Sequence, residues 1–457
     1  MSDIGALGWK AHAAEDGVYI RPTEGVEDLV SFLDSRGSST IVSSAVSVKT
    51  SINNFEAVLR RAWVRLRNAN PSLAVSVLRE NNEGFLRYDA NDTKEWLEET
   101  FFVHQQMTPE QMYCNTTPFK RTELHWFKGD GDHQEIYIRS IHENMDGMGV
   151  IHLTNQFLEL VAASQNEQAT EKDVLLNLAP PLRIAAGVGA ETYAAEGGKI
   201  LQDFAAGMRE NAVSLPAKHS PSSAAEPGIL DMTLSSSTTR SILKACKERG
   251  ITITHAYHAA LALGVMKLNP PQEGHRIHTL SILISVRDRL LPPYRGSKRP
   301  TALYNTSQYL RMAMPEPSTP QTEAFLLLAR RFKDTYTDAR EDVKLIAIQK
   351  ALMEMTVQFL AQMKSENTTA SGSPQLSSLG NLDTLLKPTY GGLVVEKYFY
   401  GVQMRGSSQV ALWTFHGELK MAIFFDRGDF DQSFLVQLME ETRRTLLAGL
   451  GVEPNTI

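Results

Sequence analysis

The stretch Glu135-Ile-Tyr-Ile-Arg-Ser-Ile-His142-Glu-Asn-Met-Asp146-Gly147 decides the expected fold of this chain. Its first part, 135–141, alternates polar and apolar residues with a period of two, which is typical of a half-buried β-strand. After Gly147 the apolar residues recur at helical spacing, at Val150, Leu153, Phe157 and Leu160. The pattern therefore predicts a strand, a short loop and a helix, with His142 at the point where the strand ends.

His142 is the residue of this stretch with the clearest chemistry. A neutral imidazole on a rigid element can take a proton from an alcohol, an amine or a thiol. Asp146 follows too closely around the same turn to be assumed the orienting carboxylate of a Ser-His-Asp triad. We expect it to hold the loop through a salt bridge, and Gly147 to permit a close approach that a Cβ would prevent. Asp-Gly is also a common turn sequence, so the motif needs support from elsewhere in the chain.

The composition excludes several classes of function. The chain has 457 residues, a net charge of -6 and no basic block, so nucleic acid is not an expected partner. No run reaches the ~18–20 apolar residues of a membrane span, and no secretory signal is visible. Only Cys114 and Cys246 occur, far apart, which excludes a disulfide framework and a cysteine-based zinc site. We therefore expect a cytoplasmic protein without a membrane partner. We also expect a monomer.

The pattern along the chain predicts two α/β regions joined by a linker. We expect an N-terminal lobe at 1–180, a crossover linker at 181–228 and a C-terminal lobe at 229–457. The linker is rich in Ala, Gly, Ser and Pro. Further elements are predicted in all three parts: helices at 54–70 and 191–209, a buried strand at 279–286, and a hairpin of strands at 410–415 and 419–425.

Arg287 is the first residue outside the motif that supports a functional site. It follows the predicted buried strand, and a guanidinium in such a place is costly unless it is paired. Asp146 is an available partner for a bidentate salt bridge. The alternative is an Arg-Asp-Arg turn at the surface.

Three further residues are candidates for oxyanion or substrate contacts: Asn305, Ser378 and Trp413. Ser378 belongs to 377–381, a segment of small residues that we expect to be a loop whose hydroxyl or backbone donors face a developing oxyanion. An ordinary loop is the alternative. Trp413 lies on a predicted strand, where its indole N–H faces either a cleft or the core.

No metal site and no other catalytic signature is expected. His255 and His258 are three residues apart on a predicted helix without a third ligand, so helix packing explains them better than a metal. The chain has no Gly-x-Ser-x-Gly elbow, no phosphate loop and no dinucleotide fingerprint. These absences fit a mechanism that uses a base without a covalent enzyme intermediate.

Taken in order, these features resemble the chloramphenicol acetyltransferase-like superfamily over nearly the whole chain. Its branches include the BAHD acyltransferases, peptide-synthetase condensation domains and trichothecene-type O-acetyltransferases of moulds. The HxxxDG motif of the family matches His142, Asp146 and Gly147, and Arg287 looks like the arginine that pairs with the motif aspartate. Weaker likenesses follow the same order along the chain, at Leu66-Arg-Asn-Ala-Asn-Pro71-Ser-Leu73 (the family's "HPxLR" segment), Tyr304-Asn305 and Ser377–Asn381 (its "SNLG" loop).

Two departures place the chain nearer the stand-alone fungal O-acetyltransferases. Ile141 replaces the first histidine of the HHxxxDG form that most condensation domains use. The DFGWG motif of plant BAHD enzymes is missing, because Asp426-Arg-Gly-Asp-Phe430 differs from it in residue type.

The resemblance implies two α/β lobes, each a mixed sheet flanked by helices, with an active-site tunnel between them. It also implies an acyl-CoA-dependent O-acyltransferase, acetyl being the expected group, with His142 as general base and a small-molecule alcohol from secondary metabolism as acceptor. Acyl-CoA would be a co-substrate, and no bound cofactor is expected. One alternative is a condensation-type enzyme that takes its acyl chain from a carrier protein and forms an ester or an amide. A second is a catalytically silent binding module, against which the retention of His142 and Asp146 argues.

Overall fold

The computed structural model describes residues 4–38, 40–80, 83–163, 174–189, 193–218, 225–362 and 372–453. The chain forms two compact units, each of which is mixed α/β, as predicted. The first unit consists of Met1–Thr192, Ser285–Thr306 and Thr384–Gln403, and the second of Tyr193–Ile284, Ser307–Asp383 and Met404–Ile457. The units do not follow chain order, because two later segments belong to the first. The predicted division at 180 and 228 stays a prediction.

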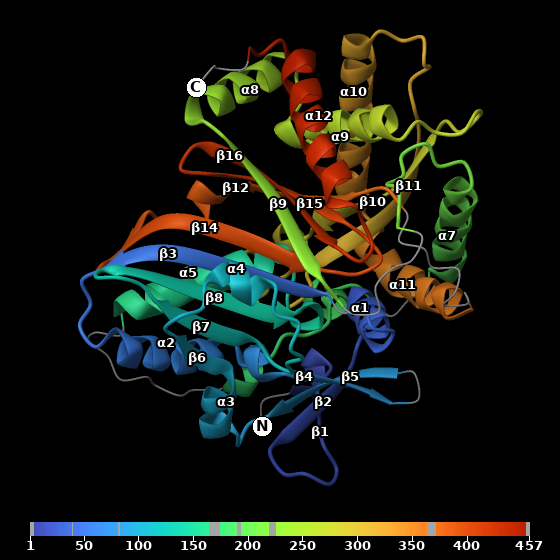
Figure 1. Ribbon diagram of the computed structural model, residues 1–457. Coiled ribbons are helices and arrows are strands. Elements are labelled where there is room, and N and C mark those ends of the chain that lie inside the picture. The colour runs from blue at the N-terminus through green and yellow to red at the C-terminus, as the bar shows by residue number, and fades with distance from the viewer. Residues whose placement is uncertain are drawn as a thin grey trace. The chain divides into compact units, whose positions relative to one another are not determined.

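A six-stranded mixed sheet forms the framework of the first unit (Figure 1). Its strands lie in the order β13 (Thr389–Tyr390), β14 (Leu393–Gln403), β3 (Ile41–Thr50), β8 (His133–Ile141), β7 (Glu123–Lys128) and β6 (Phe101–His104). The pair β6–β7 is parallel and the other pairs are antiparallel. The predicted strand at 135–141 is therefore the main part of β8, paired on both sides.

Helices cover both faces of this sheet. On one face lie α2 (Phe55–Ala69) and α5 (Gly147–Ala163) (Figure 1), and the Ser44 hydroxyl of β3 is 2.6 Å from the Thr154 hydroxyl of α5. On the other face, Met112 of the short α4 (Pro109–Tyr113) packs with Ala45, Phe127 and Tyr137. Alternate residues of β3 thus point to opposite helices, as the two-residue period of a strand requires.

Aromatic packing anchors α5, the helix that begins directly after the histidine motif. Trp63 of α2 is fully buried, as the predicted apolar stripe of 54–70 requires. Its ring stacks on Trp96 of α3 (Thr93–Thr100) at 5.3 Å between centroids and meets the edge of Phe157 of α5 at 6.0 Å. Such pairs contribute about 0.5–1.5 kcal/mol beyond burial. The interior of α5 is therefore packed against a rigid aromatic neighbour.

A smaller antiparallel sheet completes the first unit, with the helix α1 (Val26–Ser35) beside it. Its strands lie in the order β1 (Lys10–Ala11), β2 (Val18–Pro22), β5 (Glu83–Asp89) and β4 (Ser76–Glu80). Short helical segments of the same unit are η1 (Ile4–Leu7), η2 (Pro71–Ala74), η3 (His142–Asn144), η4 (Val174–Asn177), α6 (Leu182–Ala185) and η5 (Arg287–Arg289).

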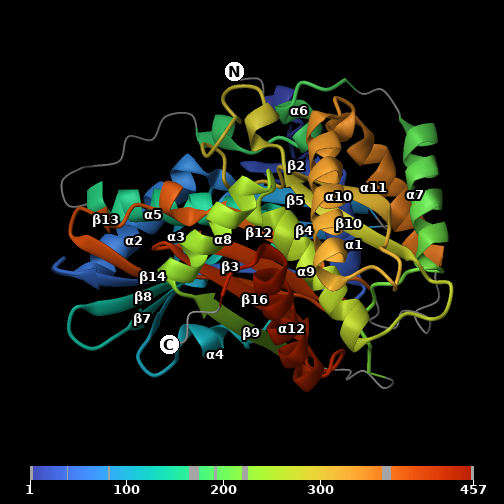
Figure 2. The same ribbon diagram turned by 90° about the horizontal axis from the view of Figure 1, so that it is seen from above.

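The second unit is built on a four-stranded sheet in the order β12 (Gln375–Asn381), β15 (Gln409–Phe415), β16 (Glu418–Asp426) and β9 (Pro227–Leu234). The predicted hairpin is β15–β16. Helices α8 (Ser236–Glu248), α9 (Ile253–Leu268), α10 (Gln321–Glu341) and α12 (Gln432–Leu450) pack together in this unit (Figure 2). Helix α7 (Ala194–Met208), which corresponds to the helix expected at 191–209, packs on α11 (Leu345–Gln362). The predicted strand at 279–286 is β10 (Ile277–Ser285), paired with β11 (Asn305–Ala313). The segment η7 (Leu382–Thr384) follows β12.

The prediction of a loop at 377–381 is wrong, because these residues belong to strand β12. The strand runs parallel to β15, which supplies its backbone hydrogen-bond partners. A run of small residues gives no sign in the sequence of such a distant partner. Its register shifts between Ser378 and Gly380, and Gly380 has φ 79°, in the left-handed region that glycine tolerates. The segment is therefore a bulged strand.

Candidate functional site

His142 lies directly after β8 and is the first residue of η3. Its backbone N–H donates to the Thr40 carbonyl at 3.0 Å, and its side chain is half-buried. Its Nδ1 is 2.8 Å from the Met145 carbonyl oxygen. A carbonyl can only accept a hydrogen bond, so Nδ1 carries the proton of the neutral ring. The lone pair is therefore on Nε2, which is the arrangement that a general base requires.

The surroundings of His142 favour the neutral ring. Burial lowers the pKa of His142 from its ordinary value, and the Met145 carbonyl and the Asp146 charge oppose this effect only in part. A histidine with a lowered pKa is unprotonated at neutral pH. The base form is therefore the resting form of this residue.

Asp146 and Arg287 form the buried ion pair that the sequence predicted. The Arg287 Nη2 donates to both carboxylate oxygens of Asp146, at 3.0 Å each. Both residues are 3% exposed. Two backbone groups also donate hydrogen bonds to this carboxylate. The Gly149 N–H donates to Oδ1 at 2.6 Å, and the Tyr304 N–H donates to Oδ2 at 2.8 Å. Asp146 therefore holds the first turn of α5 and the segment before β11 at the same point.

Arg287 also donates hydrogen bonds to backbone carbonyls of the segment 299–302. Its Nη1 donates to the Arg299 carbonyl at 2.8 Å, and its Nη2 also lies 3.0 Å from the Ala302 carbonyl. The guanidinium carbon is 5.2 Å from the centre of the Tyr304 ring. A single cation thus ties 299–304 to the histidine motif, so the alternative of a surface Arg-Asp-Arg turn is wrong.

Gly147 is required by a close approach, as expected. A Cβ at this position would lie 2.7 Å from the Tyr400 hydroxyl oxygen of β14. Gly149, one residue further, would bring a Cβ to 2.3 Å from the Pro300 carbonyl. Neither contact can relax cheaply, so both glycines let α5 start against its neighbours.

The three expected oxyanion or substrate contacts are not brought together within one unit. Asn305 belongs to the first unit and is partly exposed; its buried Oδ1 has no hydrogen-bond partner among the described residues. It follows Tyr304 directly and so lies beside the ion pair. Ser378 and Trp413 belong to the second unit, on β12 and β15. The Ser378 side chain is exposed, with its hydroxyl 2.8 Å from that of Thr254, and Trp413 is 4% exposed.

The two histidines of α9 have packing and capping roles. His255 accepts the Thr252 N–H at the start of the helix, at 3.2 Å, and the His258 ring stacks on Phe332 with centroids 3.9 Å apart. Within the described ranges, no group of three or more His, Cys, Asp or Glu is arranged to hold a metal ion. In the same ranges, no helix has the length and apolar character needed to cross a membrane.

Two groups of the site were missed by the sequence reasoning. The Met145 carbonyl orients His142, and a backbone group leaves no mark in a residue pattern. Glu143 is 3% exposed, and burial raises its pKa to about 7, with Asp34 and Glu27 of α1 adding to the effect. No sequence pattern marks Glu143, because its burial depends on the packing of the turn.

Removing either partner of the Asp146–Arg287 pair should strongly destabilise the protein. We expect Asp146→Ala and Arg287→Ala each to lower the free energy of unfolding by about 3–5 kcal/mol, because each strands a buried charge. In a double-mutant cycle measured by urea unfolding, the two losses should be clearly less than additive. The exposed pair Glu159–Lys387 is the matched control, for which about 0–1 kcal/mol is expected. Additive losses at Asp146 and Arg287 would contradict the pairing.

The buried Glu143 should make stability fall as the pH rises. The pKa of this carboxyl is near 4.5 when unfolded and about 7 when folded, so the folded state holds the proton more tightly. Stability from this group is complete below pH 4.5 and is lost through pH 7, on the order of 3 kcal/mol in total. Glu143→Gln should therefore gain stability over wild type between pH 5 and pH 8 in urea unfolding. An advantage that does not grow with pH, as for the exposed control Glu95→Gln, would show that burial does not raise the pKa of Glu143.

The comparisons with known proteins agree with this architecture. No protein-family model matches the chain. The curated O-acetyltransferase pigM of Monascus ruber is 26% identical over 404 residues, which cover 87% of this chain and 77% of that protein. The solved TRI3 trichothecene 15-O-acetyltransferase from Fusarium sporotrichioides has a TM-score of 0.80 at 18% identity, over 96% of this chain and 98% of that one.

A solved condensation domain has the same fold. The first condensation domain of the calcium-dependent antibiotic synthetase has a TM-score of 0.63 at 14% identity, over 95% of this chain and 96% of that one. The resemblance first seen in the order of motifs is thus confirmed. The O-acetyltransferase relative indicates an acyltransferase, and the solved structures show that the chain has the fold of the trichothecene enzyme and of the condensation domain.

Proposed function

We propose that this protein is an acyl-CoA-dependent O-acyltransferase that transfers an acetyl group to a hydroxyl of a secondary metabolite. The observation that carries the proposal is the orientation of His142. Its Nδ1 is held by the Met145 carbonyl at 2.8 Å, which leaves the Nε2 lone pair as the base. Burial keeps the ring neutral at the pH where it must accept a proton.

The chemistry follows from a neutral imidazole and a thioester. The Nε2 of His142 takes the proton of the acceptor hydroxyl as its oxygen attacks the thioester carbonyl. A tetrahedral oxyanion forms and collapses by breaking the carbon–sulfur bond. The leaving sulfur takes the proton from the imidazolium, so the ester, the CoA thiol and neutral His142 are the products. Holding both substrates in one enclosed site supplies the proximity contribution to the rate.

Asp146 and Arg287 have a positioning role in this proposal. Their charges satisfy one another and the backbone N–H groups of Gly149 and Tyr304, so neither is available to move a proton. They fix the turn that carries His142. The oxyanion donors stay a proposal, with Asn305, Ser378 and Trp413 as candidates.

The acetyl group and the class of acceptor are supported by the relatives. One is named an O-acetyltransferase, and the trichothecene enzyme with the same fold is named for transfer to a 15-hydroxyl. Ile141, in place of the first histidine of the condensation motif, also favours a stand-alone O-acyltransferase. The alternative, an enzyme that takes its acyl chain from a carrier protein, is favoured by the shared fold of the condensation domain.

Replacing His142 should remove most of the activity and leave the fold intact. We expect His142→Ala to lower kcat about 10²–10⁴-fold with acetyl-CoA and an alcohol acceptor, the usual contribution of a general base. Wild-type kcat/KM should rise with pH through an apparent pKa below the ordinary histidine value, because burial lowers that pKa. His12→Ala, a half-buried histidine of the same unit, is the control. Near wild-type turnover by folded His142→Ala would remove the mechanism.

The donor should be recognised through its pantetheine arm. The sequence contains no phosphate loop and no basic cluster, so scattered contacts must hold CoA. A truncated pantetheine thioester should therefore retain acyl transfer, with the loss mainly in KM if the nucleotide contributes uniform binding.

The same assay separates the two candidate donors. We expect kcat/KM for acetyl-CoA to equal or exceed that for an acetylated carrier protein with one acceptor. A strong preference for the carrier-bound chain would favour the condensation-type alternative instead.

A further inference from the structure

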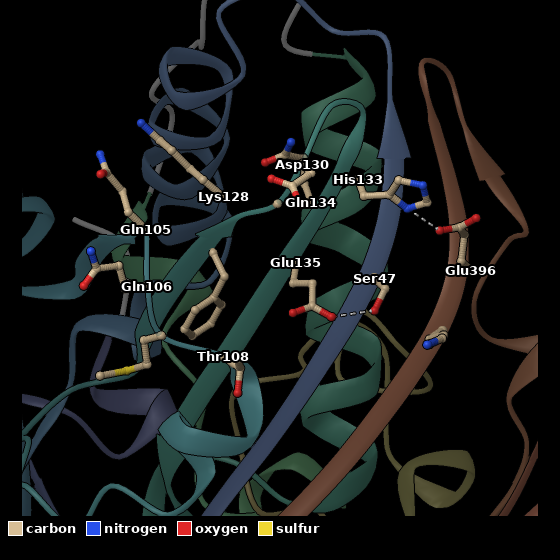
Figure 3. Close-up of a pocket in the computed structure, with 14 residues that line it drawn as sticks. Ser47, Gln105, Gln106, Thr108, Lys128, Asp130, His133, Gln134, Glu135 and Glu396 are labelled. Carbon is tan, nitrogen blue, oxygen red and sulfur yellow. Dashed lines mark hydrogen bonds and ion pairs between the residues drawn. The ribbon is translucent and has the colours of Figure 1, made fainter.

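The first unit contains a cavity of about 640 Å³. None of the residues that line it has a role in the proposed acyl transfer. Strands β3, β7, β8 and β14 line it, together with the 105–108 segment that precedes α4 (Figure 3). Glu135, on its floor, is seven residues before His142 on β8. At ~3.3 Å per strand residue the two are roughly 20 Å apart. Its volume lies in the range of small-molecule sites.

The sheet register places four chemically different side chains in one row of this cavity. Glu135 of β8 is directly opposite Phe127 of β7 on one side and Ser47 of β3 on the other. Ser47 in turn is opposite Lys397 of β14. Residues directly opposite each other share a face of the sheet. The row therefore reads aromatic ring, carboxylate, hydroxyl, ammonium.

The carboxylate of Glu135 is only partly satisfied. The Ser47 hydroxyl donates to its Oε1 at 3.0 Å, the contact drawn between the two strands in Figure 3. Its Oε2 has no hydrogen bond from any described residue, and the side chain is half-buried. A half-buried carboxylate oxygen without a protein donor is a place where a ligand cation is stabilised.

The ammonium of Lys397 is also available to a ligand. This side chain is exposed and has no ion-pair partner in the part of the chain that the structure describes. The neighbouring Glu396 is already paired with Lys49 at 2.7 Å, and the His133 Nδ1 lies 3.0 Å from its other carboxylate oxygen. Lys128 lies over the Trp126 ring, 4.8 Å from its centre.

One further charged residue, Asp130, lines the cavity, but it does not belong to the row of paired strand residues. Asp130 is exposed on the turn between β7 and β8. One anion and one cation are thus left unmatched in the row, two strand spacings, or about 10 Å, apart at their Cα atoms. At this separation two long side chains can both reach one small ligand.

We propose that this cavity binds a free α-amino acid with an apolar side chain. Its ammonium pairs with Glu135, whose second carboxylate oxygen has no donor among the described residues. Its carboxylate pairs with Lys397 across Ser47, and its apolar side chain lies toward Phe127 and Met107. This site is independent of the acyl-transfer proposal, since it uses none of the residues of the histidine motif.

Binding of L-phenylalanine to the full-length protein tests the proposal. Isothermal titration calorimetry should give a Kd of about 1 mM or lower, that is roughly -4 kcal/mol. N-acetyl-L-phenylalanine lacks the ammonium and L-phenylalaninamide lacks the carboxylate, so each should bind at least about tenfold more weakly, a loss of about 1.4 kcal/mol. These ligand comparisons need no variant. No binding, or equal binding of either derivative, overturns the proposal.

Variants then locate the site. Glu135→Gln keeps an acceptor for Ser47, and Lys397→Gln changes an exposed residue, so both should fold. Each should weaken L-phenylalanine binding about tenfold or more. Glu95→Gln and Lys94→Gln, both exposed on α3, are the matched controls and should bind as wild type does. The ¹³C-methyl resonance of Met107 should shift on titration. Undiminished binding by the Glu135→Gln and Lys397→Gln variants, or an unshifted Met107 methyl group, would place the amino acid elsewhere and overturn the proposal.

Discussion

The buried ion pair of Asp146 and Arg287 is the constraint on which the motif region depends. Two opposite charges, each 3% exposed, stabilise a protein only if nearly all their hydrogen-bonding capacity is used. Here the carboxylate accepts from one guanidinium nitrogen and from the N–H groups of Gly149 and Tyr304. Three chain segments, 142–149, 287–289 and 299–304, therefore meet at one point. Glycines 147 and 149 are the geometric consequence, because a Cβ at either would displace a neighbour.

The ion pair leaves His142 chemically separate from the motif carboxylate. The ring is oriented by the Met145 carbonyl and not by a carboxylate, so no negative partner raises its pKa enough to offset burial. A neutral base suits proton abstraction from an alcohol better than a permanently protonated imidazole. The aspartate thus fixes the place of the histidine, and the backbone fixes its tautomer. Burial raises the pKa of Glu143 to about 7, so near neutral pH this carboxyl carries less charge next to the base than an exposed glutamate would.

Strand β8 connects the turn of His142 with the cavity that contains Glu135. Strand β8 ends at Ile141, directly before His142, while near its other end it presents Glu135 in a row with Phe127, Ser47 and Lys397. The six-stranded sheet fixes both by register, since a slip of one residue would move every side chain to the other face. The same period of two that buries Ala45 and Tyr137 under α4 points Ser44 to α5.

The sequence by itself determined the elements whose signal is local. The alternation of 135–141 predicted β8, the stripe of 54–70 predicted α2, and a guanidinium after a buried strand predicted the partner of Asp146. The order of motifs predicted the shared acyltransferase fold, and with it the mixed α/β units and the histidine to examine. These features are visible because period and residue type are properties of neighbours along the chain.

Only the tertiary structure decided what depends on partners distant in sequence or on backbone atoms. The segment 377–381 is a strand because β15 lies beside it, although its small residues predict a loop. The segments 285–306 and 384–403 join the first unit because β14 pairs with β3 and Arg287 with Asp146. The tautomer of His142 depends on a carbonyl that every residue possesses, and the raised pKa of Glu143 depends on burial; a residue pattern contains neither. The row from Phe127 to Lys397 exists because strands far apart in sequence pair in one register, and that register is set by the packing of the whole sheet.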